Sequence, residues 1–503
     1  MFWGILGIIV TVIVAIAVGY YFYQRSENKN RGFQSDTART LSEMKAYLDD
    51  LPQIRGAKKK KTLSEILQYH KAKKYDLAVK QTEYYLKNYS LMDGERTATL
   101  VLLAIILSNK NADQEALPIL SEAGLISERT KNIKALQTIE VLRGEVFWKL
   151  NRYAEALQSL ETAIKLEPDN PVTWCQKGIV LEMLDQYDDA LQALEKSIKL
   201  KPDDPVAWYN KGTVLERLGR YADALQSFEK TVELKPDEHD AWCQKGTLLE
   251  KFGRHADGLR SFEKVIELKP DYAEAWYNKG VALGNLGRYE DSLKAYERAI
   301  ELKPDHANAW NDKGIALGEL NRHDDALKAF ERAIELKPDY IGAWNSKGAV
   351  LGKLNRHDDA HKALERAIEL KPDCFGAWTN KGAALVDLNR FDDALKAFER
   401  ALELCPDHAA AWINKGVALD KLNRHDDALK VFEKAIELKP DYAEAWYNKA
   451  CCRSLLLLKN KSEALKSLAK AIQLDPKNKE SAKSEEDFKG LWEDEEFRKL
   501  TAD

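Results

Sequence analysis

The sequence predicts an all-α protein: an α-solenoid superhelix of stacked helix–turn–helix repeats, preceded by one transmembrane helix. Two observations predict this fold class. Residues 2–23 form an uncharged apolar run, and nine tryptophans recur at a spacing of 34 residues. A large aromatic residue that returns in register indicates one supersecondary unit copied many times. The tryptophans are Trp174, Trp208, Trp242, Trp276, Trp310, Trp344, Trp378, Trp412 and Trp446.

Composition excludes some classes of partner. The 503 residues carry 77 basic and 81 acidic side chains, for a formal net charge of −4. Such a balanced chain has no general positive field to attract phosphates, so we expect no nucleic-acid partner. The six cysteines are scattered without a CxxC spacing, which is consistent with reduced thiols in a cytoplasmic compartment.

The apolar run of residues 2–23 predicts a membrane anchor. At about 1.5 Å per residue, its 22 residues could cross a hydrocarbon core of roughly 30 Å. A cleaved signal peptide is the alternative, but only Met1 precedes the run and no basic start is present. Arg25, Lys29 and Arg31 follow the run. Because positively charged residues that flank a membrane span tend to lie on the cytoplasmic side, we expect a single-pass membrane protein with the repeat array in the cytoplasm.

Residues 24–61 read as a basic linker. Ten Lys or Arg residues stand against five Asp or Glu residues, and Lys58 to Lys61 is the densest basic stretch. Two interpretations stay open. Each basic charge could contribute about 1 kcal/mol of attraction to anionic lipid. Alternatively, the segment is a solvated linker with one short helix around residues 41–51.

One repeat, residues 171–204, shows why the unit folds as a helical hairpin. Apolar residues three or four positions apart trace one face of a first helix from Trp174 and one face of a second helix from Ala190. Gly178 and Ala190 are small where the two helix axes must approach closely. Pro202 cannot continue the second helix, so it closes the unit.

This pattern resembles the tetratricopeptide repeat family. The copy that begins at Asn308 carries the family signature well, and several residue types recur in register with it. Ten copies can be placed over residues 137–478, and the last has Ala450 where the others have glycine. The signature residues of the copy from Asn308 are Trp310, Gly314, Leu317, Ala326, Phe330, Ala333 and Pro338.

The two ends of the array are less regular. Residues 62–136 are predicted to be irregular helical hairpins that cap the array. Within them, the apolar stretch Leu100 to Leu107 is too short for a second span, so we expect a buried helix. Residues 479–503 are predicted to be an acidic capping helix with a polar outer face, because arrays need such an end for solubility. An acidic docking tail is the alternative.

No catalytic, cofactor-binding or metal-binding residues are predicted, and no cofactor is expected. His357 and His361 are four residues apart on a helix, but the sequence suggests no third ligand. Paired acids such as Asp324 and Asp325 recur in almost every copy and are better explained as helix starts than as a general acid and base. We therefore expect that the protein is not an enzyme.

In the tetratricopeptide repeat family, which this chain resembles, the first helices line a concave face that holds a peptide or helix of the partner. For this chain, the resemblance implies that a row of carboxamide side chains and nearby tyrosines contact the partner. The carboxamides could form hydrogen bonds with a peptide backbone. The alternative is that these amides are only solvated, exposed positions. The predicted partner-binding residues are Gln176, Asn210, Gln244, Asn278, Asn380, Asn414, Asn448, Tyr209, Tyr277 and Tyr447, with Asp312 and Ser346 interrupting the row.

Two departures from the family qualify this resemblance. The carboxylate clamp that grips chaperone tails has Asn directly after the repeat glycine, whereas Thr213, Val281 and Ile315 stand there in this chain. A clamp-type chaperone receptor is therefore not expected. The recurrent Lys, as in Lys211, replaces a residue that is usually apolar in the family.

Together, these features predict a membrane-anchored cytoplasmic scaffold or receptor that binds protein partners through its concave surface. The expected partners are proteins or extended peptide segments, and the membrane through the N-terminal helix; no small-molecule substrate is expected. One alternative is a regulatory subunit that recruits an enzyme, such as a glycosyltransferase or secretion component, to the membrane. The other is an enzyme with an unrecognised site.

Overall fold

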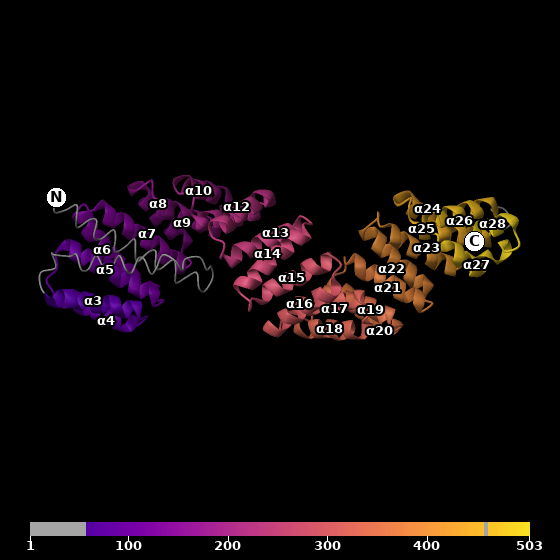
Figure 1. The fold of residues 1–503 in the computed structure, drawn as a ribbon, viewed down its shortest axis with the longest axis horizontal. Helices are drawn as coiled ribbons and strands as arrows, with labels where there is room; N and C mark the ends of the chain where they lie inside the picture. Colours follow the sequence, from indigo (N-terminus) through magenta and orange to yellow (C-terminus); the bar gives the residue numbers. More distant parts are fainter. Residues whose placement is uncertain (1–56, 457–460, 503) are drawn as a thin grey trace. The chain divides into compact units, whose positions relative to one another are not determined.

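A computed structural model describes residues 57–456 and 461–502. All regular elements in these residues are helices, which confirms the all-α class and the helical repeats (Figure 1). The chain divides into two compact units, Met1–Pro270 and Asp271–Asp503. Each unit is a stack of helical hairpins and is described by itself.

The predicted membrane localisation is corrected. Within residues 57–456 and 461–502, no helix is both long enough and apolar enough to cross a membrane. This finding contradicts the expected single-pass membrane protein. The predicted span, residues 2–23, and most of the predicted basic linker lie outside the described residues.

The first unit contains α3 to α14. Consecutive helices pair as antiparallel hairpins, α3 with α4, α5 with α6, and so on to α13 with α14. The bounds are α3 Ala57–Lys71, α4 Tyr75–Asn88, α5 Asp93–Asn109, α6 Asp113–Arg129, α7 Ile133–Lys149, α8 Tyr153–Leu166, α9 Pro171–Met183, α10 Tyr187–Leu200, α11 Pro205–Arg217, α12 Tyr221–Leu234, α13 His239–Lys251 and α14 His255–Leu268.

The second unit contains α15 to α28 and one 3-10 helix, η1. Hairpins again follow the chain, from α15 with α16 to α25 with α26. The bounds are α15 Ala273–Asn285, α16 Tyr289–Leu302, α17 Ala307–Glu319, α18 His323–Leu336, α19 Ile341–Lys353, α20 His357–Leu370, α21 Phe375–Asp387, α22 Phe391–Leu404, α23 Ala409–Lys421, α24 His425–Leu438, α25 Ala443–Leu455, α26 Lys461–Leu474, α27 Asn478–Ser484, η1 Glu486–Leu491 and α28 Glu495–Thr501.

The first hairpins, α3 to α6, depart from the repeat signature but still form a core. Leu100 to Leu107 lie in α5 and are all buried, as expected for a core helix, with Val101 and Ile106 fully covered. Most of them pack with residues of α6 and α7, such as Leu120 and Ile139, whereas Leu102 and Ile106 pack with residues of α3 and α4. The helix α3 begins at Ala57, so the end of the predicted basic linker is helical.

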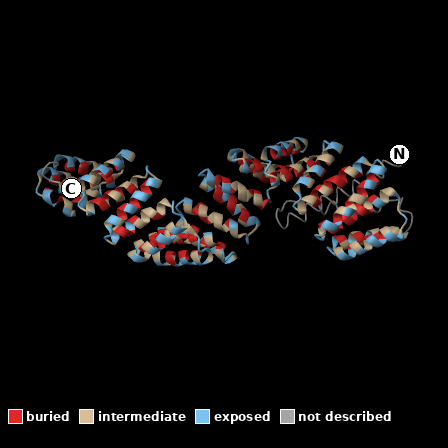
Figure 2. Cartoon of the chain, turned by 180° about the vertical axis from the view of Figure 1, so that it is seen from behind, coloured by how far each residue is buried: buried red, intermediate tan, exposed pale blue. Residues whose placement is uncertain are grey.

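Within a regular copy, one glycine lets the two helices touch. In the hairpin of α17 and α18, a Cβ atom built on Gly314 would lie 2.6 Å from a ring carbon of Phe330, so the aromatic ring occupies the place of a side chain. The turn between the helices places Asn321 at a φ of 58°, a left-handed conformation that asparagine tolerates better than most residues. Figure 2 shows the buried residues concentrated on the facing sides of the helices.

Contacts between copies explain why Trp, Pro and Lys recur together. The Trp208 indole donates a hydrogen bond to the carbonyl of Pro202, which ends the preceding copy, over 2.8 Å. Lys211 lies over the Trp208 ring at 5.5 Å and reaches Glu195 on the preceding second helix at 2.9 Å. The same lysine–glutamate pair recurs in the second unit, for example Lys415 with Glu399 at 3.1 Å. The recurrent lysine therefore fastens neighbouring copies together.

The C-terminal end is made of three short elements, α27, η1 and α28, where a single capping helix was expected. Phe488, Leu491 and Phe497 are buried, and Trp492 packs on the same cluster. The chain breaks into short turns because these apolar residues do not keep a helical spacing long enough for one helix face. The acidic side chains are carried on this compact end.

Candidate functional site

The first helices of successive copies contact one another. In the first unit α9 contacts α11, and in the second unit each first helix from α15 to α25 contacts the next. No pair of successive second helices in the described chain has a comparable contact. Each stack is therefore tighter on the side of its first helices. We name the residues one and two positions after each repeat tryptophan the inner row.

The predicted partner-binding residues belong to this inner row, but they are less exposed than expected. Gln176 is buried, with 7% of its surface exposed. The other nine are half-buried: Tyr209, Asn210, Gln244, Tyr277, Asn278, Asn380, Asn414, Tyr447 and Asn448.

In the second unit, inner-row side chains bond from one copy to the next. The Tyr277 hydroxyl on α15 donates to the Asp312 carboxylate on α17 over 2.9 Å. The Asn380 amide on α21 donates to the Asn345 carbonyl oxygen on α19 over 3.0 Å. Both bonds join a residue one position after a tryptophan to a residue two positions after the next tryptophan. The inner row is thus a partly hydrogen-bonded polar surface.

The charge of Asp312 is held in a poorly solvated place. Burial raises the pKa of Asp312, and the hydrogen bonds from Asn311 and Tyr277 oppose that rise. Burial, followed by the charge of Asp312, also raises the pKa of Tyr277, so its hydroxyl stays protonated and remains a donor. The His306 ring stacks on Tyr277 with centroids 4.8 Å apart. This cluster contains the one carboxylate of the inner row in the second unit.

In the first unit, the inner row is less completely paired. The Gln244 amide is hydrogen-bonded to the Tyr209 hydroxyl. The Asn210 amide donates to the Val206 carbonyl in its own helix over 2.8 Å. Gln176 is different, because neither its amide nitrogen nor its amide oxygen has a hydrogen-bond partner among the described residues. A buried polar group without a partner costs free energy, so Gln176 would gain by turning toward a bound group.

At the end of the array, the inner row meets the C-terminal elements. The Tyr447 ring packs edge-on against Phe488, with centroids 5.7 Å apart. Its hydroxyl has no hydrogen-bond partner within the described chain. One edge of the Tyr447 ring therefore packs against η1, and less of its surface is accessible to a partner than the sequence suggested.

Two members of the inner-row network were missed by sequence reasoning. Asp312 was taken as an interruption of the amide row, and Asn345 was not considered. Both positions follow a repeat tryptophan, at one or two residues, and are polar. The amide row was predicted from one position, two residues after each tryptophan. Reading both positions together in each pair of adjacent copies would have shown that polar residues can pair between copies.

The acidic pairs and the paired histidines have structural partners. Asp324 and Asp325 lie in the first turn of α18, and Asp325 accepts a bond from Arg322 over 2.7 Å, as expected for a helix start. His357 lies 3.3 Å from Asp387, and His361 lies 3.5 Å from Glu365. The two histidines thus face different carboxylates.

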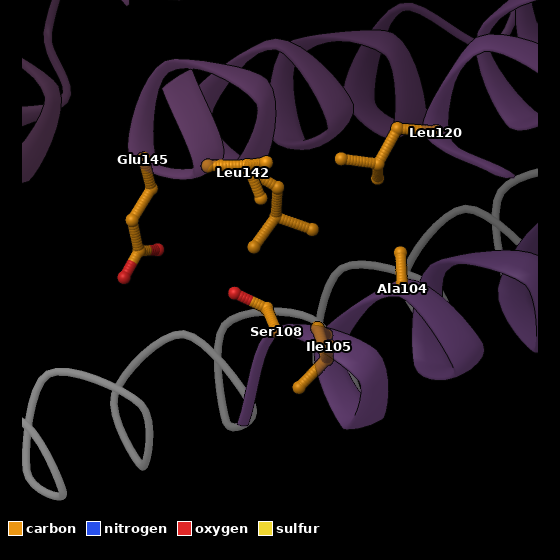
Figure 3. A pocket seen from close by; sticks show the side chains of 7 residues that line it. Ala104, Ile105, Ser108, Leu120, Leu142 and Glu145 are labelled. Carbon is orange, nitrogen blue, oxygen red and sulfur yellow. The ribbon is translucent and has the colours of Figure 1, made fainter. Parts of the chain in front are cut away.

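A small hollow in the first unit lies between α5, α6 and α7 and is lined mainly by aliphatic residues, with Ser108 and Glu145 (Figure 3). Beside the hollow, Ser108 meets a lysine and an aspartate. The Lys149 ammonium donates to the Ser108 hydroxyl over 2.6 Å and lies 3.5 Å from Asp113. Burial lowers the pKa of Lys149 to about 7. Because Lys149 also donates to the Ser108 carbonyl near the end of α5, this cluster joins α5 to α7.

Family comparisons agree with the repeats seen in the structure. Tetratricopeptide repeat models match residues 280–341, 346–409, 379–443 and 418–479, and also 176–243, 261–294 and 239–272, while a TPR repeat model matches 144–185. The chain belongs to the tetratricopeptide repeat family. No curated protein matches it.

Solved structures resemble the fold at low identity. YrrB, described as a TPR protein with an unusual peptide-binding site, is 24% identical with a TM-score of 0.36, over 38% of this chain and 98% of its own. The Cut9–Hcn1 structure of APC/C is 14% identical with a TM-score of 0.46, over 91% and 99%. Part of a repeat protein from Cytophaga hutchinsonii is 19% identical with a TM-score of 0.41, over 47% and 97%. These likenesses concern the fold and do not bear on function.

Proposed function

We propose that this chain is a protein-binding scaffold that holds an extended segment of a partner along the inner row. The observation that carries the proposal is the placement of carboxamide and tyrosine side chains at the same two positions of the first helices in both units. Repeat arrays generally bind through the surface that their stacked helices present along one side.

The chemistry of the inner row suits a peptide backbone. A carboxamide offers one acceptor and two donor hydrogens, so it can complement both the C=O and N–H groups of an extended chain. Half-burial lowers the exposure of these groups to water, which strengthens each hydrogen bond. The unpartnered Gln176 amide supports such an interaction in the first unit.

The test compares two variants of the full chain with three substitutions each. One variant changes the inner-row residues Asn380, Asn414 and Asn448 to Ala. At about 0.5–1.5 kcal/mol per hydrogen bond, their combined loss should weaken binding by an order of magnitude or more. Partners are captured from a cell extract with the wild-type chain and identified by mass spectrometry. Dissociation constants are then measured for a purified partner.

The matched control changes Lys328, Lys396 and Lys430 to Ala on the second helices, where their side chains are 77%, 76% and 75% exposed. The control should bind as the wild type does. Both variants are checked by thermal unfolding, because Asn380 also bonds to Asn345. Equal affinity of the inner-row variant and wild type, with a loss in the control, would place the binding surface on the second helices.

A further inference from the structure

A cysteine, a histidine and an aspartate from three helices converge near the end of the second unit. Asp420 lies in the last turn of α23, His425 begins α24, and Cys452 lies in α25 of the next copy. The Nδ1 atom of His425 is 2.8 Å from the Oδ1 atom of Asp420, and the Cys452 thiol donates to the same oxygen over 2.9 Å. The three possible ligand atoms all lie within 4.8 Å of one another.

The site is sheltered but reachable. Cys452 is 1% exposed, while the side chains of His425 and Asp420 are 19% and 16% exposed. An ion can therefore enter past the histidine and the carboxylate and reach a thiol that is shielded from water. Low exposure also strengthens the attraction between a cation and negatively charged ligands, because less water screens the charges.

The repeat register shows that the fold does not require this thiol. The other eight tryptophan copies have only Val, Leu or Ala at the position of Cys452: Val180, Val214, Leu248, Ala282, Ala316, Val350, Ala384 and Ala418. An acid and a histidine at the positions of Asp420 and His425 occur together in one other copy, as Glu250 and His255. Only the copies of Trp412 and Trp446 add a cysteine to that pair.

The arrangement does not fit a nucleophilic cysteine. Histidine would have to lie between the thiol and the carboxylate to act as its base, whereas here Asp420 is the shared acceptor of both groups. The Cys452 thiol donates its proton to Asp420, and a protonated thiol is a poor nucleophile.

The position of the carboxylate favours a cation. Asp420 occupies the end of a helix, where the helix dipole disfavours a negative charge. A bound dication would offset this effect.

We propose that Asp420, His425 and Cys452 bind one transition-metal dication of the zinc type, with water as the fourth ligand. Carboxylate, imidazole and thiolate are common zinc ligands, with bonds of about 2.0–2.3 Å. In a tetrahedral site, the hydrogen-bonded atoms, Nδ1 of His425 and Oδ1 of Asp420, and Sγ of Cys452 and the same oxygen, would lie only about half an ångström further apart than they do here. The ion replaces the thiol proton, which is released to solvent, and the imidazole proton of His425 moves from Nδ1 to Nε2 so that Nδ1 can bind the ion.

The bound ion fastens the last copy to the one before it, since Cys452 belongs to α25 and the other two ligands to the preceding hairpin. Binding to the folded form alone stabilises it in proportion to the logarithm of the ion concentration. Thermal unfolding of this end of the chain should therefore shift upward with added zinc, and the shift should keep growing with the logarithm of the zinc concentration.

The test titrates the full chain, first freed of metal with a chelator, with Co²⁺ as the probe. One equivalent should bind and produce a sulfur-to-cobalt charge-transfer band, which Zn²⁺ then removes by displacement. Cys452→Ser and His425→Gln should each weaken binding by at least about 10–100-fold, the range typical even for loss of outer-shell partners. Cys452→Ser should also abolish the band.

Two control variants keep the site intact. Cys451→Ser changes the adjacent buried thiol, and His255→Gln changes the histidine that lies 2.8 Å from Glu250 in the first unit. Both should bind Co²⁺ as the wild type does. Circular dichroism verifies folding, and if Cys452→Ser does not fold, the half-buried His425→Gln variant decides the matter.

Three results would overturn the proposal: Co²⁺ that does not saturate at one equivalent, a band that survives Cys452→Ser in the folded chain, or binding that is lost in Cys451→Ser instead. In each of these cases, the three groups form a hydrogen-bonded contact between copies and nothing more.

Discussion

The N-terminal hairpins α3 to α6 and the regular copies reach close packing in different ways. In the regular copies, an aromatic or leucine side chain of the second helix packs against a glycine of the first helix, as Phe398 packs against Gly382. In α5, long aliphatic side chains fill the core, and Ser108 joins Asp113 and Lys149 across helices. The first mode depends on the absence of a side chain, and the second depends on the volume of side chains. Removing side-chain volume should therefore destabilise the first region, and adding side-chain volume should destabilise the second.

The largest effect is expected from removing volume in α5. Leu103 is 3% exposed in the aliphatic core, so Leu103→Ala should lower the free energy of unfolding by about 2–5 kcal/mol. In a repeat array, stability is shared mainly between neighbours, so hydrogen exchange should quicken in α5 to α7 and stay unchanged in α21 to α24. The conservative Leu103→Met change should cost less than about 1.5 kcal/mol. Equal loss of protection in all helices would show that the two regions unfold together.

An intermediate effect is expected from adding volume in a regular copy. A Cβ atom at Gly382 would lie 2.4 Å from a ring carbon of Phe398, so Gly382→Ala should destabilise the chain by about 1–3 kcal/mol. Gly318 in α17 is the matched control, because its Cβ would have nothing within 4 Å. Gly318→Ala should stabilise by about 0.5–1 kcal/mol through helix propensity. Urea unfolding of both variants measures the difference, and a shared sign would contradict the packing role of Gly382.

The smallest effect concerns Gly258 in α14, where the equivalent copies mostly carry alanine. Helix propensity alone predicts a gain of about 1 kcal/mol for Gly258→Ala. The structure reduces that expectation, because the new Cβ would lie 2.6 Å from the Glu250 carboxylate, which is bonded to His255 over 2.8 Å. Displacing this carboxylate should offset most of the gain.

A double-mutant cycle separates the two contributions. With Glu250→Ala already present, Gly258→Ala should recover the stabilisation of about 1 kcal/mol, since the obstructing carboxylate is gone. Thermal or urea unfolding of the four proteins gives the coupling. The same gain in both backgrounds would mean that Glu250 moves aside without cost.

The sequence predicted the structure within each repeat well, but it did not predict most side-chain contacts between neighbouring repeats. The helix pairs, the close approach at Gly178 and the buried helix at Leu100 to Leu107 were all expected and are present. The inner row was located on the first helices, but its half-burial and the bond between Tyr277 and Asp312 were not foreseen. The expected membrane localisation is contradicted, because no helix within residues 57–456 and 461–502 is long and apolar enough to cross a membrane.

By itself, the sequence determined the helical hairpin and its family, because helix periodicity, turn residues and the glycine contact are encoded within about 34 residues. Only the tertiary structure decided the partners across copies: Lys211 with Glu195, Asn380 with Asn345, and Cys452 with Asp420. These contacts depend on the offset and rotation with which one hairpin stacks on the next. That geometry results from the packing of whole helix faces, and no single position along the chain specifies it.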